Sequence, residues 1–218
     1  MITPQTFYEF GAESVETTRA ATSVRPTITP SSFSVPTLVW DTETAGLSKP
    51  GVCQLAYVLY RNGVCTEYNK ILRLPDGVNM SKEAVNIHKI TYEASAAGAD
   101  PKIELVEFLK LVDDVQMEGG VVAGHNVCHF DCRAVNFTLQ QLGLYQQISP
   151  THMLDTMTLS KAHSPLTTVN GRKKNFKLSE LYQHLYGEYP TWARLHNALD
   201  DVRVNVLCLL GGRRNGWW

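Results

Sequence analysis

The sequence predicts a single α/β domain, and three observations support this class. Short runs rich in β-branched and aromatic residues alternate with longer segments whose apolar residues recur at helical spacing. Asn62-Gly63 separates two of the short runs, which is a strong hairpin signal because both central positions of a type I′ turn need positive φ. The chain has 218 residues, a length that suits one domain with a sizeable core.

Composition limits the function classes. The 20 basic residues nearly balance the 21 acidic ones, so nucleic-acid binding would have to depend on a local patch. The five cysteines include no C-x-x-C pair, which argues against a zinc knuckle or a disulfide framework. The sequence has no apolar segment of transmembrane length and no signal-peptide pattern at its start. We therefore expect a soluble intracellular protein, either cytoplasmic or in the nucleoid or nucleus.

The first 36 residues differ in composition from the rest of the chain. They are rich in Ser, Thr and Pro and show little apolar periodicity. Such segments bury too little apolar surface to offset the entropy of ordering. We expect residues 1–36 to form a flexible leader, residues 37–212 to form the domain and residues 213–218 to form a short tail.

Three β-prone runs open the domain. Leu38-Val39-Trp40 is an apolar run that predicts a buried strand, and residues 52–60 and 64–74 lie on either side of the Asn-Gly turn. A turn of this kind joins antiparallel neighbours. We therefore expect the fold to begin as an antiparallel meander.

Capping residues and apolar stripes predict the helices and the remaining strands. Ser81 can cap a short helix that runs through Ile87, and Asp100 followed by Pro101 opens a longer one. The later elements are expected in this order: a buried strand at 121–123, a helix at 130–142 stopped by Gly143, a short segment at 153–156 that leads into a helical stretch, a short helix at 177–185, and a last helix at 198–210 ended by Gly211-Gly212.

Asp41 and Glu43 follow the first apolar run directly. Side chains alternate between the two faces of a strand, so both carboxylates point the same way. Two like charges this close would raise one another's pKa, and a divalent cation between them would relieve the repulsion. A strand that ends in a solvated acidic turn, with Gly46 as the turn residue, would account for the same residues.

Asp131, His196 and Asp201 are further candidates for the same site. Asp131 begins the helix after the strand at 121–123, near the strand edge where open α/β sheets hold their sites, although an Asp there also suits the helix dipole. With Asn197 as N-cap, His196 and Asp201 take the two positions of a hydrophobic staple, yet both are polar. We assign Asp201 to the site and its neighbour Asp200 to the cap.

No acidic residue occurs between Thr156 and Ser179. A charge run of this kind is usually a solvated loop, and its alternative role is contact with a phosphate backbone near the acidic site. The stretch holds five basic residues: Lys161, Arg172, Lys173, Lys174 and Lys177. It is the local positive patch that the net charge conceals.

The candidate residues fall in three motifs, which are, in order, Asp41-x-Glu43-x-x-Gly46-Leu47, His125-Asn126-x-x-x-Phe130-Asp131 and His196-x-Ala198-x-x-Asp201. Taken together, these motifs resemble the DEDDh family of 3′-5′ exonucleases, which includes the proofreading subunit of bacterial replicative polymerase, RNase T and oligoribonuclease. The sister class with Tyr in place of His would put that Tyr at Asn197. Weaker similarities at 84–91, 154–156 and 177–181 support the resemblance.

The resemblance implies a fold, a chemistry and a set of residues. The fold would be RNase H-like, a mixed central sheet flanked by helices with the strand of Asp41 at its centre. Asp41, Glu43, Asp131 and Asp201 would hold two Mg²⁺ or Mn²⁺ ions, one to activate water and one to stabilise the leaving 3′-oxygen, and His196 would be the general base.

Substrate contacts follow from the same resemblance. The chain at Thr44, Ala45 and Gly46 would contact the terminal nucleotide, and Leu47 would form a wedge between the last two bases. His88 and Asn126 lie in matching segments, whereas Arg172, Lys173 and Lys174 are proposed from the basic stretch alone. Two of these residues keep an alternative, since Leu47 could be a core residue and His88 a helix-end cap.

The expected substrate is nucleic acid with a free 3′ end. We favour DNA, single-stranded or frayed, with release of nucleoside 5′-monophosphates. The same chemistry on RNA is an alternative, because discrimination depends on contacts to the 2′-OH. A second alternative is a non-catalytic subunit that binds nucleic acid or a polymerase, and a polymerase or another replication or repair protein is the candidate partner.

Overall fold

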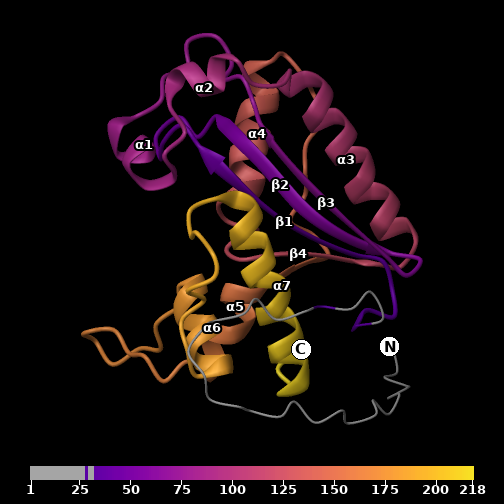
Figure 1. The fold of residues 1–218 in the computed structure, drawn as a ribbon, viewed down its shortest axis with the longest axis vertical. Coiled ribbons are helices and arrows are strands. Elements are labelled where there is room, and N and C mark those ends of the chain that lie inside the picture. Colours follow the sequence, from indigo (N-terminus) through magenta and orange to yellow (C-terminus); the bar gives the residue numbers. More distant parts are fainter. Residues whose placement is uncertain (1–27, 29–31) are drawn as a thin grey trace.

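A mixed five-stranded sheet forms the centre of the protein, in a computed structural model that describes residues 28 and 32–218 (Figure 1). Most of the expected leader lies outside the described residues. The strand order is β3-β2-β1-β4-β5, in which β1, β2 and β3 are antiparallel and β1, β4 and β5 are parallel. The strands are β1 (Thr37–Thr44), β2 (Val52–Arg61), β3 (Val64–Ile71), β4 (Val121–Gly124) and β5 (Met153–Asp155).

Seven α-helices accompany the sheet in the described part of the chain. They are α1 (Lys82–His88), α2 (Tyr92–Ala96), α3 (Pro101–Met117), α4 (Asp131–Gln141), α5 (Thr156–Ser160), α6 (Leu178–Tyr186) and α7 (Ala198–Arg214). A 3₁₀ turn at Lys161–His163 follows α5. This arrangement confirms the expected mixed sheet flanked by helices, with the strand of Asp41 at its centre.

The tight turn and the helix caps that the sequence predicts are present in the structure. Asn62 and Gly63 have φ values of 53° and 73°, so they make the tight turn between β2 and β3. Ser81 accepts the N–H of Ala84 at 3.0 Å, and Asp100 accepts that of Lys102 at 2.9 Å, so both residues cap their helices. Each of these elements depends on contacts within a few residues.

The two faces of the sheet are covered by different helices. Leu38 and Trp40 of β1 face α3 and α4, and the ring of Trp40 packs against Phe108 at 4.9 Å. Val39, on the other face of β1, packs with Val202 and Val206 of α7. Figure 1 shows α7 crossing one side of the sheet, with α3 and α4 on the opposite side. The central strand is therefore buried on both faces.

The last helix does not end at Gly211-Gly212 as expected, because α7 continues to Arg214. Gly212 is buried in the helix, and a Cβ built on it would lie 1.9 Å from the ring of Trp218. The indole N–H of Trp218 donates to the carbonyl of Leu209 at 3.0 Å. Gly212 therefore makes room for an aromatic side chain and does not terminate the helix.

Other features lie at the margins of the domain. Phe33 is buried against Tyr60, with ring centroids 4.6 Å apart, so the chain before β1 packs on the sheet.

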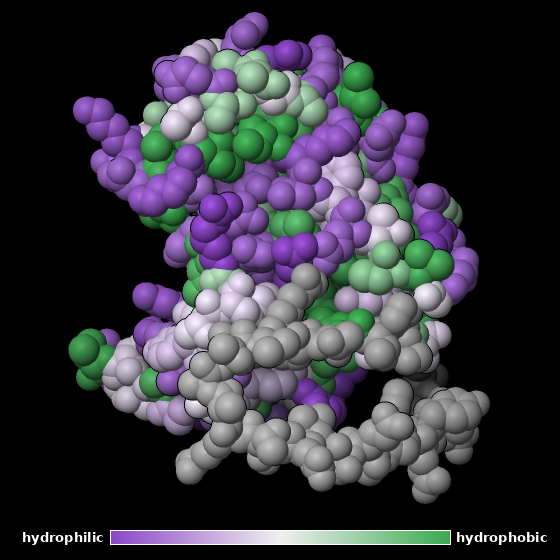
Figure 2. All heavy atoms as spheres, in the orientation of Figure 1, coloured by the Kyte–Doolittle hydropathy of each residue, from purple (hydrophilic) through white to green (hydrophobic). Residues whose placement is uncertain are grey.

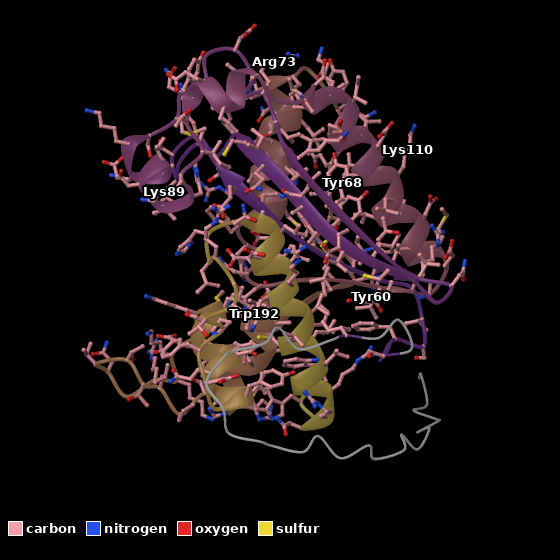
Figure 3. The ribbon with its side chains drawn as sticks, in the orientation of Figure 1. Tyr60, Tyr68, Arg73, Lys89, Lys110 and Trp192 are labelled. Atoms are coloured by element: carbon pink, nitrogen blue, oxygen red, sulfur yellow. The ribbon has the colours of Figure 1, made fainter. Side chains whose placement is uncertain are left out.

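In Figure 3, Tyr68 lies on β3 on the side of α3, where it hydrogen-bonds to Glu104. Within the described residues, no helix is long and apolar enough to cross a bilayer.

We predict that Gly212→Ala destabilises the fold by about 1–3 kcal/mol, because the new methyl group displaces Trp218. The same change in a Trp218→Ala background should stabilise the helix by about 0.5–1 kcal/mol, the ordinary preference for Ala over Gly. Urea unfolding of the four proteins measures both effects. A stabilising Gly212→Ala in the otherwise unchanged chain would contradict this packing.

Candidate active site

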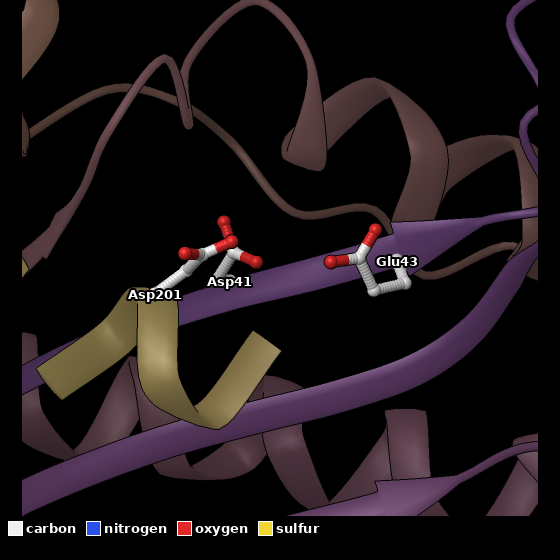
Figure 4. Close-up of side chains that lie close together, drawn as sticks. All are labelled: Asp41, Glu43 and Asp201. Atoms are coloured by element: carbon white, nitrogen blue, oxygen red, sulfur yellow. The ribbon is translucent and has the colours of Figure 1, made fainter. Parts of the chain in front are cut away.

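Three carboxylates meet on the α7 face of the sheet. Asp41 and Glu43 lie two residues apart on β1 and point the same way, and Asp201 faces them from the first turn of α7 (Figure 4). One ligand oxygen from each of the three lies within 4.8 Å of the others. The alternation inferred from the sequence is therefore correct, and the cluster is a candidate metal site.

The buried face of α7 fixes the position of Asp201. Ala198, Val202 and Val206 have no exposed surface and pack against residues of β1, β2 and β4. At the start of the helix, the N–H of Ala198 donates to the side-chain oxygen of Gln54 on β2 at 3.3 Å. With this end anchored to the sheet, the helix carries Asp201 to the carboxylates of β1.

Asp131 approaches from the opposite layer. Pairing between β1 and β4 ends at Val39 and Ala123, which leaves the N–H of Thr42 without a strand partner on that side. Asp131 accepts that N–H at 2.9 Å and the Thr42 hydroxyl at 2.6 Å, both through Oδ1. The buried carboxylate of Asp131 thus lies beside the cluster, close enough for its charge to act on Asp41, although it is not one of the three that converge.

Asp155 holds the chain that leads to Asp131. Its Oδ1 accepts the N–H groups of Asn126 and Met157 at 3.0 Å and that of Thr158 at 3.3 Å. Its Oδ2 accepts the N–H of Cys128 at 3.2 Å. One buried carboxylate therefore caps α5 and fixes the segment between β4 and α4.

The cluster is electrostatically unfavourable without a cation. Burial raises the pKa of Asp41 well above its usual value, and the charges of Asp131, Asp201 and Glu43 add to this effect. Burial and the neighbouring charges also raise the pKa of Glu43 to about 8. For Asp131 and Asp201, burial raises the pKa to about 7 despite the hydrogen bonds that oppose it.

The donor set fits a hard divalent cation. All candidate ligands are carboxylate oxygens, which Mg²⁺ and Mn²⁺ prefer. Oδ1 of Asp201 is buried and has no hydrogen-bond partner among the described residues, although buried carboxylate oxygens are normally satisfied. A cation at the cluster would supply the missing interaction.

His196 is tied to the cluster through its backbone. Its N–H donates to Oδ2 of Asp201 at 3.0 Å, which brings together the two staple positions expected from the sequence. The residue has a φ of 64°, a left-handed conformation that is uncommon for a non-glycine residue, and it is exposed. His196 is therefore a surface residue whose backbone lies beside Asp201.

Asp200 differs from the cap that the sequence predicts. Its Oδ2 accepts the N–H of Arg194 at 3.1 Å, further back along the chain than the N-cap Asn197. Its Oδ1 accepts from Arg203 at 2.9 Å. Asp200 therefore fastens the chain before α7 and takes no part in the converging group.

The predicted substrate contacts fall into two sets, of which the first surrounds the end of β1. Thr44 and Ala45 are buried, Gly46 follows them, and Leu47 is 77% exposed, which excludes a core role for Leu47. His88 is buried below this turn, where its Nδ1 accepts the N–H of Ile90 at 3.0 Å. The Nε2 of His88 then carries the proton and donates to the carbonyl of Thr44 at 3.3 Å. His88 therefore supports the turn from inside.

The second set lies on connecting segments. Asn126 is half-buried with a φ of 64° and donates its N–H to Asp155. Arg172, Lys173 and Lys174 are exposed on the segment that projects between α5 and α6 (Figure 1). Two of these charges already have protein partners, because Lys173 contacts the carbonyl of Ala162 and Lys174 lies 3.4 Å from Glu180.

Sequence reasoning missed the polar residues that hold the site together. Thr42 lies between the two carboxylates of β1 and faces the other layer, so the alternation of the strand could have indicated a partner there. Gln54, Asp155 and Arg203 act through contacts with residues distant in sequence. No local pattern predicts contacts of that kind.

The sheet order and the carboxylates at the end of its central strand define the class of exonucleases with an RNase H-like fold. The model of a family described as Exonuclease (RNase_T) matches residues 38–209. The chain therefore belongs to the exonuclease family, and it is an enzyme of the 3′-5′ exonuclease class, as its resemblance to the DEDDh members predicts. No curated protein matches the chain significantly.

Solved structures with the same fold come from several exonucleases. Exonuclease X in complex with 5′-overhanging duplex DNA is 22% identical, with a TM-score of 0.56 over 84% of this chain and 94% of that chain. E. coli exonuclease I in complex with a dA16 oligonucleotide is 17% identical, with a TM-score of 0.62 over 84% of this chain and 42% of that one. A 3′-exonuclease that recognises a histone mRNA stem-loop is 14% identical, with a TM-score of 0.63 over 83% of this chain and 64% of that chain. This chain therefore spans less than half of exonuclease I.

The raised pKa values predict that the folding stability of the metal-free protein depends on pH. Between the ordinary carboxyl pKa of about 4 and the raised value of about 8 at Glu43, these groups bind more protons in the folded state than in the unfolded state. Their contribution to stability must therefore fall as pH rises through this window. His125, whose pKa burial lowers to about 4, gives the opposite slope, so matched variants are needed.

We predict that the variant Asp41→Asn with Glu43→Gln is more stable than the wild type in EDTA, by a margin that grows from pH 5 to pH 8. Urea unfolding at each pH measures the difference. Mg²⁺ should raise the melting temperature of the wild type and leave that of the variant unchanged, most clearly at pH 8. A margin that does not depend on pH would contradict the electrostatic cause.

Proposed function

We propose that this protein removes nucleotides from the 3′ end of DNA and releases nucleoside 5′-monophosphates. The observation that carries the proposal is the convergence of Asp41, Glu43 and Asp201 within 4.8 Å, with a buried oxygen of Asp201 that has no hydrogen-bond partner among the described residues. Family membership supports the exonuclease chemistry. The DNA substrate rests on the expectation from sequence, and it agrees with the DNA in the complexes of exonuclease X and exonuclease I.

The four carboxylates would hold two Mg²⁺ or Mn²⁺ ions. Asp41, Glu43 and Asp201 supply oxygens on the α7 face, and Asp131 supplies the carboxylate from the α4 layer. Bound there, the cations would activate a water molecule and stabilise the charge on the leaving 3′-oxygen. Thr42 keeps Asp131 oriented by occupying one of its oxygens.

His196 would act as the general base. An imidazole suits this role because its ordinary pKa is near neutral pH. The hydrogen bond from its backbone to Asp201 keeps the residue beside the carboxylates, and the exposed ring can reach a water molecule in front of them. The ring would take the proton of that water as the phosphodiester is attacked.

The end of β1 would receive the terminal nucleotide. The backbone of Thr44, Ala45 and Gly46 would contact it, and the exposed Leu47 would insert between the last two bases. The ring of His88 fixes the carbonyl of Thr44, so we propose that it shapes this turn from below. Asn126 would line the opposite side, on the segment held by Asp155. Figure 2 shows hydrophilic residues over the first turns of α7, beside this region.

Two alternatives make different predictions. An exoribonuclease would use the same chemistry on an RNA substrate. The structural likeness to a 3′-exonuclease that recognises a histone mRNA stem-loop is consistent with this alternative. Labelled single-stranded DNA, duplex DNA and RNA of one sequence, incubated in parallel with Mg²⁺ or Mn²⁺, separate the substrates. A non-catalytic binding subunit would form no product from any of them and would bind equally well without metal.

We predict that Asp41→Asn reduces cleavage by about a hundred- to a thousandfold, a loss comparable to removal of one key electrostatic group in other enzymes. EDTA should have the same effect on the wild type, and Mg²⁺ should reverse it. Asp113→Asn makes the same change at an exposed position on α3 and should leave activity intact. Full activity of the Asp41 variant, or of the wild type in EDTA, would disprove the assignment.

The basic segment gives a separate prediction. Replacing Arg172, Lys173 and Lys174 with Ala should weaken binding about equally for all sequences, because phosphate contacts carry no sequence information. On single strands, the slope of log K against log salt should flatten by about 0.7 for each phosphate that the protein no longer neutralises. Maximal turnover should stay near the wild-type value.

The control for the basic segment carries Lys102→Ala and Lys110→Ala, which remove exposed charges from α3 on the other face of the sheet (Figure 3). This control should keep the wild-type salt slope. Since Lys173 and Lys174 already have protein partners, most of the effect should come from Arg172. An unchanged slope in the triple variant would show that the segment is only a solvated loop.

A further inference from the structure

The chain between α6 and α7 carries His196 and has little secondary structure of its own. Near its middle, Trp192 packs edge to face on Tyr182, with ring centroids 6.2 Å apart, beside α7 (Figure 3). At its end, two backbone N–H groups donate to adjacent carboxylates of α7. Arg194 donates to Asp200 at 3.1 Å, and His196 donates to Asp201 at 3.0 Å. These two hydrogen bonds fasten the segment directly before the helix.

The second carboxylate oxygen of Asp200 links the Arg194–Asp200 hydrogen bond to the sheet. Oδ1 of Asp200 accepts from the NH1 group of Arg203 at 2.9 Å. The Nε of Arg203 donates to Oε1 of Glu67 on β3 at 3.0 Å, and its NH2 group contacts the other oxygen of Glu67. A continuous chain of polar contacts thus runs from β3 through Arg203 and Asp200 to the backbone of Arg194.

A guanidinium is suited to this position. Its planar fork holds one carboxylate with two donors and still has a donor for a second carboxylate. Arg203 uses all three of its nitrogens in this way, on Glu67 and Asp200. A lysine has a single nitrogen and cannot keep the same geometry at both carboxylates. The arrangement therefore depends on arginine and not on positive charge alone.

The contacts of Arg203 contribute little to overall stability. The side chains of Arg203 and Glu67 are 23% and 32% exposed, and ion pairs at such positions contribute little to folding. The apolar face of α7 already holds the helix on the sheet. What Arg203 determines is the orientation of Asp200, and through Asp200 the position of the chain that ends in His196.

We propose that Arg203, anchored by Glu67, is a positioning residue for His196. This inference rests on the proposed function, in which His196 is the general base. A base displaced by about 1 Å can cost about a hundredfold in rate, because proton transfer needs a short and well-aligned contact. Loss of the Arg203 contacts should therefore slow turnover and leave metal and substrate binding unchanged.

The first test is Arg203→Lys, with Arg61→Lys as its matched control. Arg61 makes a similar two-donor contact with Glu118 at the far end of β2, and the exposures of that pair, 29% and 42%, are close to those of Arg203 and Glu67. Arg203→Lys should lower kcat by about 10- to 100-fold at unchanged KM and unchanged Mg²⁺ dependence. Arg61→Lys should leave all three values at the wild-type level.

A charge reversal separates positioning from simple bridging. Glu67→Arg combined with Arg203→Glu restores the ion pair between β3 and α7 but places a negative group against Asp200. If Arg203 acts only as a bridge, this double variant recovers the kcat that is lost in Glu67→Arg and in Arg203→Glu. If Arg203 acts through Asp200, kcat stays low although the ion pair is restored. Recovery of kcat in the reversed pair would overturn the proposal.

Amide hydrogen exchange gives a readout that does not depend on activity. In Arg203→Lys, the amides of Arg194 and His196 should exchange faster, and those of β1 should be unchanged. A wild-type protein that cleaves no substrate would refute the proposed function, and exchange alone would then decide whether Arg203 holds the segment. Wild-type exchange together with wild-type kcat in Arg203→Lys would refute the positioning role and leave the proposed function intact.

Discussion

The alternation of side chains along β1 is the constraint on which the rest of the structure depends. β1 pairs with β2 on one edge and with β4 on the other, and helices cover both of its faces. Its register therefore determines which of its side chains contact each layer of helices. Leu38 and Trp40 face α3 and α4, whereas Val39, Asp41 and Glu43 face α7. A shift of one residue would bury both carboxylates among the apolar side chains of the opposite layer. The core and the acidic cluster are thus specified by the same strand.

The cluster keeps like charges together at a cost to folding. Burial and nearby negative charges raise the pKa of each of its carboxyl groups, which is the opposite of what stabilising carboxylates show. Surrounding hydrogen bonds hold the groups in place against this repulsion. Thr42 fixes Asp131, and the backbone N–H of His196 fixes Asp201. The site is therefore preorganised for positive charge.

Sequence reasoning succeeded where the determining contacts are local. The Asn62-Gly63 turn and the caps at Ser81 and Asp100 depend on neighbouring residues, and the alternation of β1 follows from the strand itself. It was wrong at Gly211-Gly212, because the ring that requires a glycine there folds back from outside the helix. It did not find the hydrogen bonds from Asn126 and Cys128 to Asp155 or the contact of Arg203 with Glu67, since these partners lie on segments that only the tertiary fold brings together.

The acidic groups beside the end of β1 come from two different helical layers, and this affects how cooperatively the domain folds. Asp131 belongs to the α4 layer and Asp201 to the α7 layer, and neither reaches the end of β1 unless its helix is docked on the sheet. A partly folded form with one layer detached would lack part of the cluster. A cation held by carboxylates of both layers would therefore select the fully docked state, and its binding free energy would add to the stability of both helical layers at once.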